Sequence, residues 1–284
     1  MSFDRFGDRD YSTLPCVAGQ LPGAGRPPIL AGATVGGTRR GTVQIDWTSV
    51  RIDAVRRNRR GVGSVVAGWE GAREVDEGSS AVMAAAQVAD PYLRPTEAID
   101  WTSPEILRLA CDLGEGSADA IEIARRCFEW VRDRIAHTVD HGHEVVTFSA
   151  SEVLREKTGF CYAKSHLLAA LLRANGIRAG LAYQRLALDS EGHAFCLHGL
   201  AVVDLPGCGW YRVDPRGNKP GVDARFTPPR EHLAFPASQT GEVMFPRVYA
   251  DPVAPVVRAL KLYRSAAVLS ACLPDALTDS ELER

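Results

Sequence analysis

The 284-residue chain lacks the features that would place it in a membrane or on a secretory route. No apolar run is long enough to cross a bilayer. The first ten residues are polar and have no apolar core, so we expect no signal peptide. The seven cysteines are odd in number and show no close CxxC spacing, which argues against a disulfide scaffold and against a zinc or redox motif. We therefore expect a reduced, cytoplasmic protein.

The sequence also has little net charge and no cofactor signature. A net charge of −2 gives no general reason to expect nucleic acid or an anionic membrane as a partner. There is no P-loop, dinucleotide fingerprint or EF-hand loop. His137, His141 and His143 come nearest to a metal cluster, but they fall around a helix-to-loop junction with only Asp140 and Glu144 near them. We expect neither a cofactor nor a metal.

Residues 1–82 differ in composition from the rest of the chain. They are dense in glycine and arginine and show weak apolar periodicity, so they cannot bury enough apolar surface to offset the entropy of the chain. We expect this extension to be largely disordered, either as a tail or as sequence upstream of a true start at Met83. The alternative is a basic arm that contacts nucleic acid or a partner. Residues 83–284 have the pattern of one folded domain.

Periodicity and capping residues predict an α+β domain, with helices first and an antiparallel sheet afterwards. A capping box at Ser149–Glu152 starts a short helix that ends before Gly159. The other helices are expected at 103–113, 117–135, 161–174 and 255–270. Strands are expected at 178–188, 195–205 and 210–214, the last two joined by a turn at Pro206-Gly207.

Three residues in this pattern suggest chemistry. Cys161 opens a predicted helix, where the positive end of the helix dipole favours a thiolate. His198 and Asp214 lie on the two strands of the hairpin and would face each other if the paired residue numbers added up to 412. A tight two-residue turn would put them on opposite faces, so this interpretation requires a bulge at Gly209 or a three-residue loop.

Each of these residues also has a purely structural interpretation. A buried cysteine often only fills space, and a histidine in an apolar strand can be a satisfied core residue. The remaining histidines compete poorly for the role of a base. His166 is five positions after Cys161 and off its helical face, and His193 points to the opposite strand face from His198.

The motifs Gly159–Cys161, Leu168–Ala179, His198–Val203 and Gly209–Pro215 resemble the catalytic core of the transglutaminase-like superfamily. The resemblance implies a papain-like fold in which N-terminal helices and the nucleophile helix pack on an antiparallel sheet. It also implies that Cys161, His198 and Asp214 form a catalytic triad. A bacterial subgroup of these proteins shares further motifs, at Ala163–His166, Tyr183–Leu186 and Arg216–Lys219. One departure is Leu200, because the family commonly has an aromatic residue two positions after the histidine.

The function that this resemblance implies is cysteine-dependent acyl transfer on amide bonds of proteins or peptides, by hydrolysis or by transfer to an amine. Phe160, Tyr183, Gln184 and Asn218 are the expected substrate-binding residues. The alternative is a catalytically inactive member of the same fold that binds peptides or partner proteins.

Overall fold

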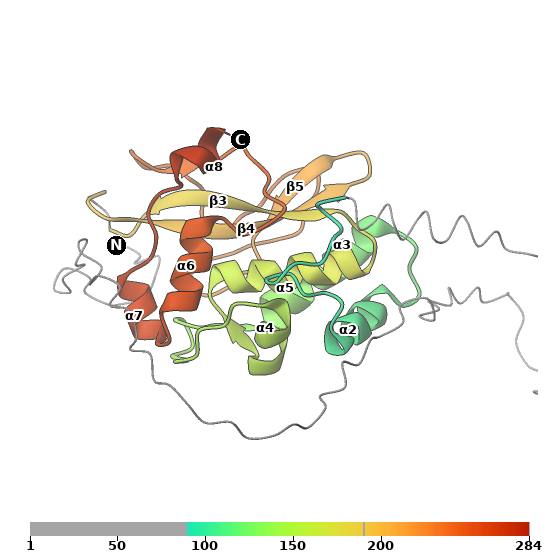
Figure 1. Cartoon of the computed structure of the whole chain (residues 1–284). Coiled ribbons are helices and arrows are strands. Elements are labelled where there is room, and N and C mark those ends of the chain that lie inside the picture. The colour runs from blue at the N-terminus through green and yellow to red at the C-terminus, as the bar shows by residue number, and fades with distance from the viewer. Residues whose placement is uncertain (1–89, 190, 284) are drawn as a thin grey trace, which may run out of the picture. The chain divides into compact units, whose positions relative to one another are not determined.

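A computed structural model of the chain describes residues 90–189 and 191–283 (Figure 1). The disordered extension expected at 1–82 lies outside these residues. The described part is built on one four-stranded antiparallel sheet, in the order β5-β4-β3-β6. Its strands are β3 (Ala179–Ala187), β4 (Phe195–Leu205), β5 (Gly209–Val213) and β6 (Val243–Met244). The three strands expected from the sequence are confirmed, and β6, which is only two residues long, was not expected.

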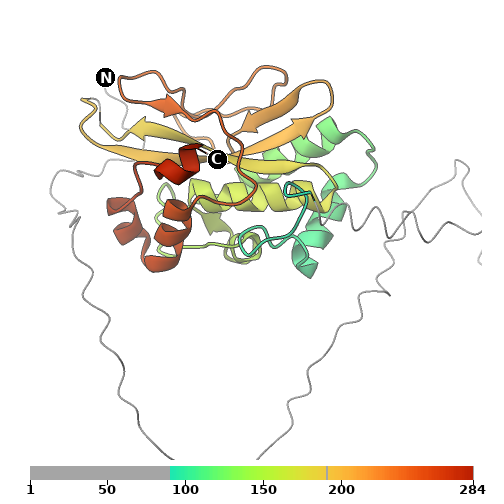
Figure 2. The ribbon, with the colours of Figure 1, turned by 45° about the horizontal axis from the view of Figure 1, so that its top comes forward.

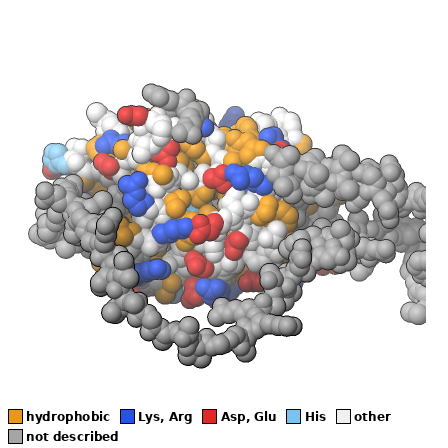
Figure 3. Space-filling view, in the orientation of Figure 1, with side chains coloured by type: hydrophobic (Ala, Val, Ile, Leu, Met, Phe, Trp, Pro, Cys, Tyr) orange, Lys and Arg blue, Asp and Glu red, His pale blue; other side chains and the backbone are white. Residues whose placement is uncertain are grey.

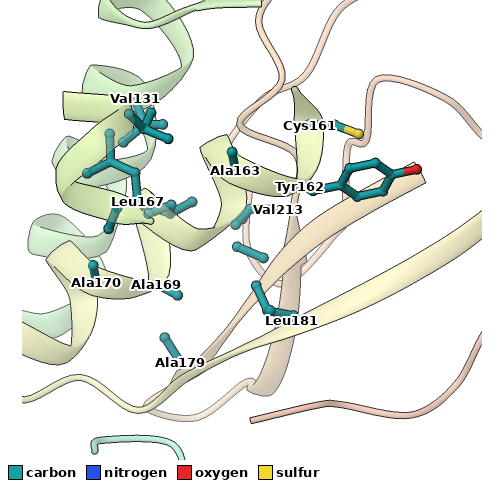
Figure 4. Packing of buried hydrophobic residues seen from close by; sticks show 14 of the residues in the cluster. Val131, Cys161, Tyr162, Ala163, Leu167, Ala169, Ala170, Ala179, Leu181 and Val213 are labelled. Carbon is teal, nitrogen blue, oxygen red and sulfur yellow. The ribbon is translucent and has the colours of Figure 1, made fainter. Parts of the chain in front are cut away.

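Most of the helices lie on one face of this sheet, in two layers (Figures 1 and 2), whereas the short last helix at 279–283 lies above β3 in Figure 1. The central helix α5 (Cys161–Ala174) packs directly on β3 and β4. On the other side of α5 lie α2 (Pro104–Gly114), α3 (Ala120–Arg134) and α4 (Ala150–Glu156). Because α5 is enclosed on both sides, it is buried from Cys161 to Arg173. Figure 4 shows its alanine and leucine side chains packed against the sheet and against α3, with Cys161 at the far end.

Local capping decides where the helices begin. Pro104 occupies the first turn of α2, and the Ser149–Glu152 capping box that starts α4 is present as expected. The helix expected from residue 117 begins at Ala120 instead, because the side chain of Asp119, which accepts a hydrogen bond from the Ile121 N–H, provides the cap.

The prediction of a single last helix at 255–270 is wrong in one respect, because the structure has two helices in this range. Helix α6 (Ala254–Leu262) and helix α7 (Ala266–Ala271) are separated by an extended stretch. In that stretch Ser265 forms a β-bridge with Val145, and the Ala266 N–H donates to the Glu144 carbonyl at 3.1 Å. The long-range bridge interrupts the helix. A short helix, α8 (Asp279–Glu283), follows near the end of the chain.

A short parallel pair brings a second segment next to the start of α5. Strand β1 (Ala136–His137) pairs with β2 (Thr158–Gly159), with His137 opposite Gly159. Two-residue strands have no periodicity that could be recognised in the sequence. The pairing nevertheless fixes where His137 lies, because Gly159 is two residues before Cys161.

The far face of the sheet has a small apolar cluster of its own. Alternate β4 residues point away from α5, so Leu200 and Val202 meet Ala182 of β3 there. Half-buried side chains from the sheet and from the segment after β5 cover this cluster: Trp210, Leu233, Met244 and Val248. Because the sheet is covered on both faces, its interior strands are apolar throughout, as in Leu197–Val203 apart from His198 and Gly199.

The exposed face of the described helices carries mixed charge. In Figure 3, basic and acidic side chains lie next to one another between apolar ones, without a patch of one sign on the visible part. Ion pairs such as Lys261–Glu97, at 2.6 Å, are exposed and add little to stability. None of the helices in the described ranges is long and apolar enough to cross a membrane.

Candidate active site

Cys161 is the first residue of α5. Phe160, in extended conformation, caps the helix through its backbone, and the helix runs for 14 residues from there. The first N–H groups of a helix have no partner inside it, so they are free to stabilise negative charge next to the thiol. The Gly199 N–H of β4 donates to Cys161 Sγ at 3.5 Å, and Cys161 is only 7% exposed. The sulfur is thus held between the helix start and β4.

The β4–β5 hairpin has the three-residue loop that the triad interpretation required. Leu205 pairs with Gly209, leaving Pro206, Gly207 and Cys208 as the loop, and both glycines have positive φ. The predicted register is wrong by two, however, since paired residue numbers add up to 414 and not to 412. Extending that register puts Asp214 opposite Leu200, diagonal to His198. A shift of two keeps both residues on the same face.

His198 and Asp214 form a buried ion pair. The distance from His198 Nε2 to Asp214 Oδ2 is 2.7 Å, and both side chains are 1% exposed or less. The backbone N–H of Arg216 donates to the other oxygen, Oδ1, at 3.1 Å. The Phe235 ring packs edge-on against the imidazole, with 5.3 Å between centroids. The carboxylate therefore fixes the ring by Nε2 and leaves Nδ1 free to face another group.

The electrostatics of the pair favour a charged imidazole. Burial opposes protonation of His198, but Asp214 and then Cys161 outweigh it and raise the pKa to about 10. Burial would likewise raise the pKa of Asp214, yet His198 and Arg216 hold it below its ordinary value. At neutral pH the site therefore has an imidazolium next to the thiol.

The pKa of His198 predicts a loss of stability at high pH. Its folded-state pKa of about 10 lies above the ordinary value of 6.5, so its contribution is fully present below about 6.5 and is lost as the pH rises through about 10. Urea unfolding of the wild type and of His198→Gln across this range should give a stability difference that shrinks with pH. A difference that grows with pH would contradict a charged His198.

Lys164 is a second buried basic group, and its contribution to stability changes with pH in the opposite direction to that of His198. Its buried ammonium donates to the carbonyl oxygens of Ile135 and Arg216, and burial, followed by Arg216, lowers its pKa to about 7. The penalty of burying its charge is therefore relieved as the pH rises from about 7 to 10.5. Only the difference between matched variants isolates His198, because the two groups act on total stability in opposite directions in the same pH range.

The Cys161 sulfur and the His198 imidazole border one narrow cavity of about 30 Å³, enough for one or two water molecules. Phe160 and Tyr162 supply aromatic lining, and Ser270 and Leu273 close it from the C-terminal part of the chain. The Leu197 N–H of β4 donates to the Pro274 carbonyl at 2.6 Å, which holds this closing segment in place.

The predicted substrate-binding residues have different positions. Phe160 lines the cavity, whereas Tyr183, Gln184 and Asn218 do not. The Tyr183 hydroxyl accepts from the Val253 N–H at 3.3 Å inside the core.

Gln184 and Asn218 have polar partners within the fold. Gln184 lies opposite His198 in the sheet and donates to the Phe235 carbonyl at 2.9 Å, so it supports the ring that packs on the imidazole. The Asn218 side chain closes a loop by accepting from the Ala224 N–H at 2.8 Å. Leu200 belongs to the cluster on the far face of the sheet and is not part of the cavity lining either.

Sequence reasoning did not assign His137 to the site. The three histidines considered as a metal cluster separate in the structure, since His137 is buried and lines the cavity while His141 and His143 are exposed. No group of three or more His, Cys, Asp or Glu among the described residues could hold a metal ion. The signal that could have found His137 is its pairing with Gly159, which depends on the two-residue strands.

Comparisons with known proteins agree with this architecture. Residues 108–215, from α2 to the end of the hairpin, match the family model of the transglutaminase-like superfamily. This segment, which contains Cys161, His198 and Asp214, is therefore similar to that superfamily, and the papain-like α+β fold expected from the sequence is confirmed. No curated protein matches the chain.

Among solved structures, two similar chains are a "putative cysteine protease" from Cytophaga hutchinsonii and the periplasmic domain of TgpA from Pseudomonas aeruginosa. The first is 20% identical, with a TM-score of 0.36, over 44% of this chain and 41% of that one. The second is 22% identical, with a TM-score of 0.35, over 46% of this chain and 47% of that one. Each of these two similarities thus covers less than half of this chain and less than half of the other chain.

Proposed function

We propose that the protein is a cysteine-dependent acyl-transfer enzyme that acts on amide bonds of proteins or peptides. The observation that carries the proposal is the convergence of Cys161, His198 and Asp214. A thiol at a helix start borders the same cavity as a histidine whose Nε2 is 2.7 Å from a buried carboxylate. A nucleophile, a base and an orienting acid in this arrangement support covalent catalysis.

In the proposed reaction the Cys161 thiolate attacks the carbonyl carbon of the amide. The carbonyl oxygen becomes an oxyanion, which the free N–H groups at the start of α5 stabilise. His198, charged at neutral pH, gives its proton to the leaving amine as the C–N bond breaks, and a thioester remains on Cys161. Asp214 holds the ring in place and stabilises its charged form.

The second half of the reaction regenerates the enzyme. His198, now neutral, takes a proton from a water molecule or from an amine, which attacks the thioester carbonyl and releases the thiolate. With water the product is a carboxylic acid, and with an amine it is a new amide. Hydrolysis and amine transfer therefore share the first half-reaction and the same triad.

Labelling with iodoacetamide at neutral pH tests the proposal. Cys161 should be alkylated stoichiometrically in the wild type and much more slowly in His198→Ala, with the site identified by peptide mass. Burial raises the pKa of Cys127 to about 12, so this thiol should stay unlabelled and serve as an internal control. Equal labelling of Cys161 in both proteins would contradict the proposal and would favour a non-catalytic binding fold.

A further inference from the structure

The cavity next to Cys161 contains a buried guanidinium that the proposed acyl transfer does not use. Arg216 is 1% exposed, lines the cavity and follows the hairpin two residues after Asp214. Its Nη2 is 2.8 Å from Asp140 Oδ2, and its Cζ lies 5.2 Å from the centroid of the Phe235 ring. Its Nη1 has no hydrogen-bond partner among the described residues. A buried charged donor without an acceptor is costly, which points to a ligand that supplies one.

The charges around Arg216 are not balanced by its neighbours. Asp140 is shared, because Lys219 Nζ also lies 2.9 Å from it. Asp214 is already paired with His198. These two carboxylates face the side chains of Arg216, Lys219 and His198. The Lys164 ammonium is a further cationic group beside them, because it donates to the Arg216 carbonyl at 2.9 Å. Basic side chains therefore outnumber acidic ones around the cavity.

A second cavity group also lacks a partner. His137 is buried, and its Nδ1 makes no hydrogen bond to a described residue, with Asp140 Oδ2 at 3.7 Å. Burial and then Arg216 keep its pKa well below the ordinary value, so the ring is neutral. A neutral imidazole has one N–H to donate. Arg216 and His137 thus provide two unsatisfied polar groups at the same cavity, on segments that are far apart in the sequence.

We propose that Arg216, together with His137, binds a carboxylate of the acyl substrate. The inference rests on the proposed function and narrows its substrate class to acyl compounds with a negative charge close to the scissile amide. A guanidinium offers a planar fork of donors that matches the two oxygens of a carboxylate. The cavity, at about 30 Å³, suits a group of only a few atoms. A neutral substrate would leave the surplus of basic side chains around the cavity without a compensating negative charge.

Two small alkylating reagents that differ in charge test this assignment. Iodoacetate carries a carboxylate and iodoacetamide does not, while in both the thiolate displaces iodide from the methylene carbon. The ratio of the iodoacetate to the iodoacetamide rate at Cys161 should exceed the ratio at exposed Cys208 by about tenfold or more, as expected for a charge-assisted hydrogen bond. Arg216→Met should bring the ratio at Cys161 down by a similar factor, and Arg216→Lys should give an intermediate value.

Controls separate this inference from the proposed function. Arg212→Met removes a basic side chain from β5 outside the cavity and should leave the ratio unchanged. In the wild type, which avoids any folding defect, acetate should slow iodoacetamide labelling of Cys161 but not of Cys208. A wild-type ratio equal to that of Cys208, or one retained in folded Arg216→Met, would overturn the carboxylate site while leaving acyl transfer intact. Failure of both reagents to label Cys161 would overturn the proposed function itself.

Discussion

Asp214→Asn should slow alkylation of Cys161 by iodoacetamide at neutral pH by roughly a factor of 10² to 10⁴, the upper figure being the cost of the same change in a Ser-His-Asp triad. The substitution preserves the shape of the side chain and removes its charge. That charge is the main factor that raises the pKa of His198 against the effect of burial. Without it, burial would favour the neutral ring, and the thiolate would lose its counterion.

Two measurements would identify the cause of the loss. A titration of the His198 ring by NMR should show its pKa falling from about 10 in the wild type to a lower value in Asp214→Asn. Asp204→Asn is the matched control, because this β4 aspartate pairs with Arg178 at 2.6 Å and belongs to a different ion pair. It should keep the wild-type labelling rate. An unchanged rate in a folded Asp214→Asn protein would contradict the role of the carboxylate.

Gly199→Ala should reduce both the stability of the protein and the reactivity of Cys161. A Cβ at this position would lie 2.7 Å from Tyr162 Cδ1 and 3.1 Å from Tyr162 Cα, and the second contact is with backbone. Overpacking of a core costs about 1–3 kcal/mol, and we expect the upper end because a backbone cannot rotate away. To relieve the contact, β4 and the start of α5 must separate, which weakens the bond from the Gly199 N–H to Cys161 Sγ.

A second glycine separates the effect on stability from the effect on the site. At Gly180 a Cβ would lie 2.8 Å from the Tyr249 carbonyl oxygen, so Gly180→Ala has a comparable conflict in β3, where the contacts do not involve Cys161 or His198. Urea unfolding should show a loss of stability in both variants. Labelling under native conditions should be slowed only in Gly199→Ala. If both variants label at the wild-type rate, the close approach of β4 to α5 is not what positions the thiol.

The parts of the fold that could be predicted from the sequence are those fixed by neighbouring residues. Helix α5 follows from the apolar run after Cys161, and its end follows from Asn175-Gly176. The capping box of α4 is likewise a local pattern. The three-residue hairpin loop follows from requiring His198 and Asp214 to share a face. Each of these depends on residues close together in the chain, or on the period of a strand.

The parts that could not be predicted depend on contacts between distant segments. His137 lies at the cavity because two very short strands pair in parallel, and α6 and α7 are separate because Ser265 bridges to Val145. The side chain of Lys164 is satisfied by carbonyl groups of other segments, which no local pattern reveals. The interpretation of Tyr183 and Gln184 as a polar rim was reasonable for strand residues, but their side chains have partners inside the fold.

The length of the hairpin loop limits how this chain can change over evolution or by design. As long as the hairpin keeps a three-residue loop, deleting or inserting a single residue among Pro206, Gly207 and Cys208 shifts the register by one. Every β5 side chain would then turn over, and the carboxylate after Val213 would point away from the imidazole. A change of two residues would keep its side but move it along the strand by about 7 Å, beyond hydrogen-bonding reach. Variation in this hairpin should therefore take the form of substitutions, although its tip is exposed and would otherwise tolerate length changes.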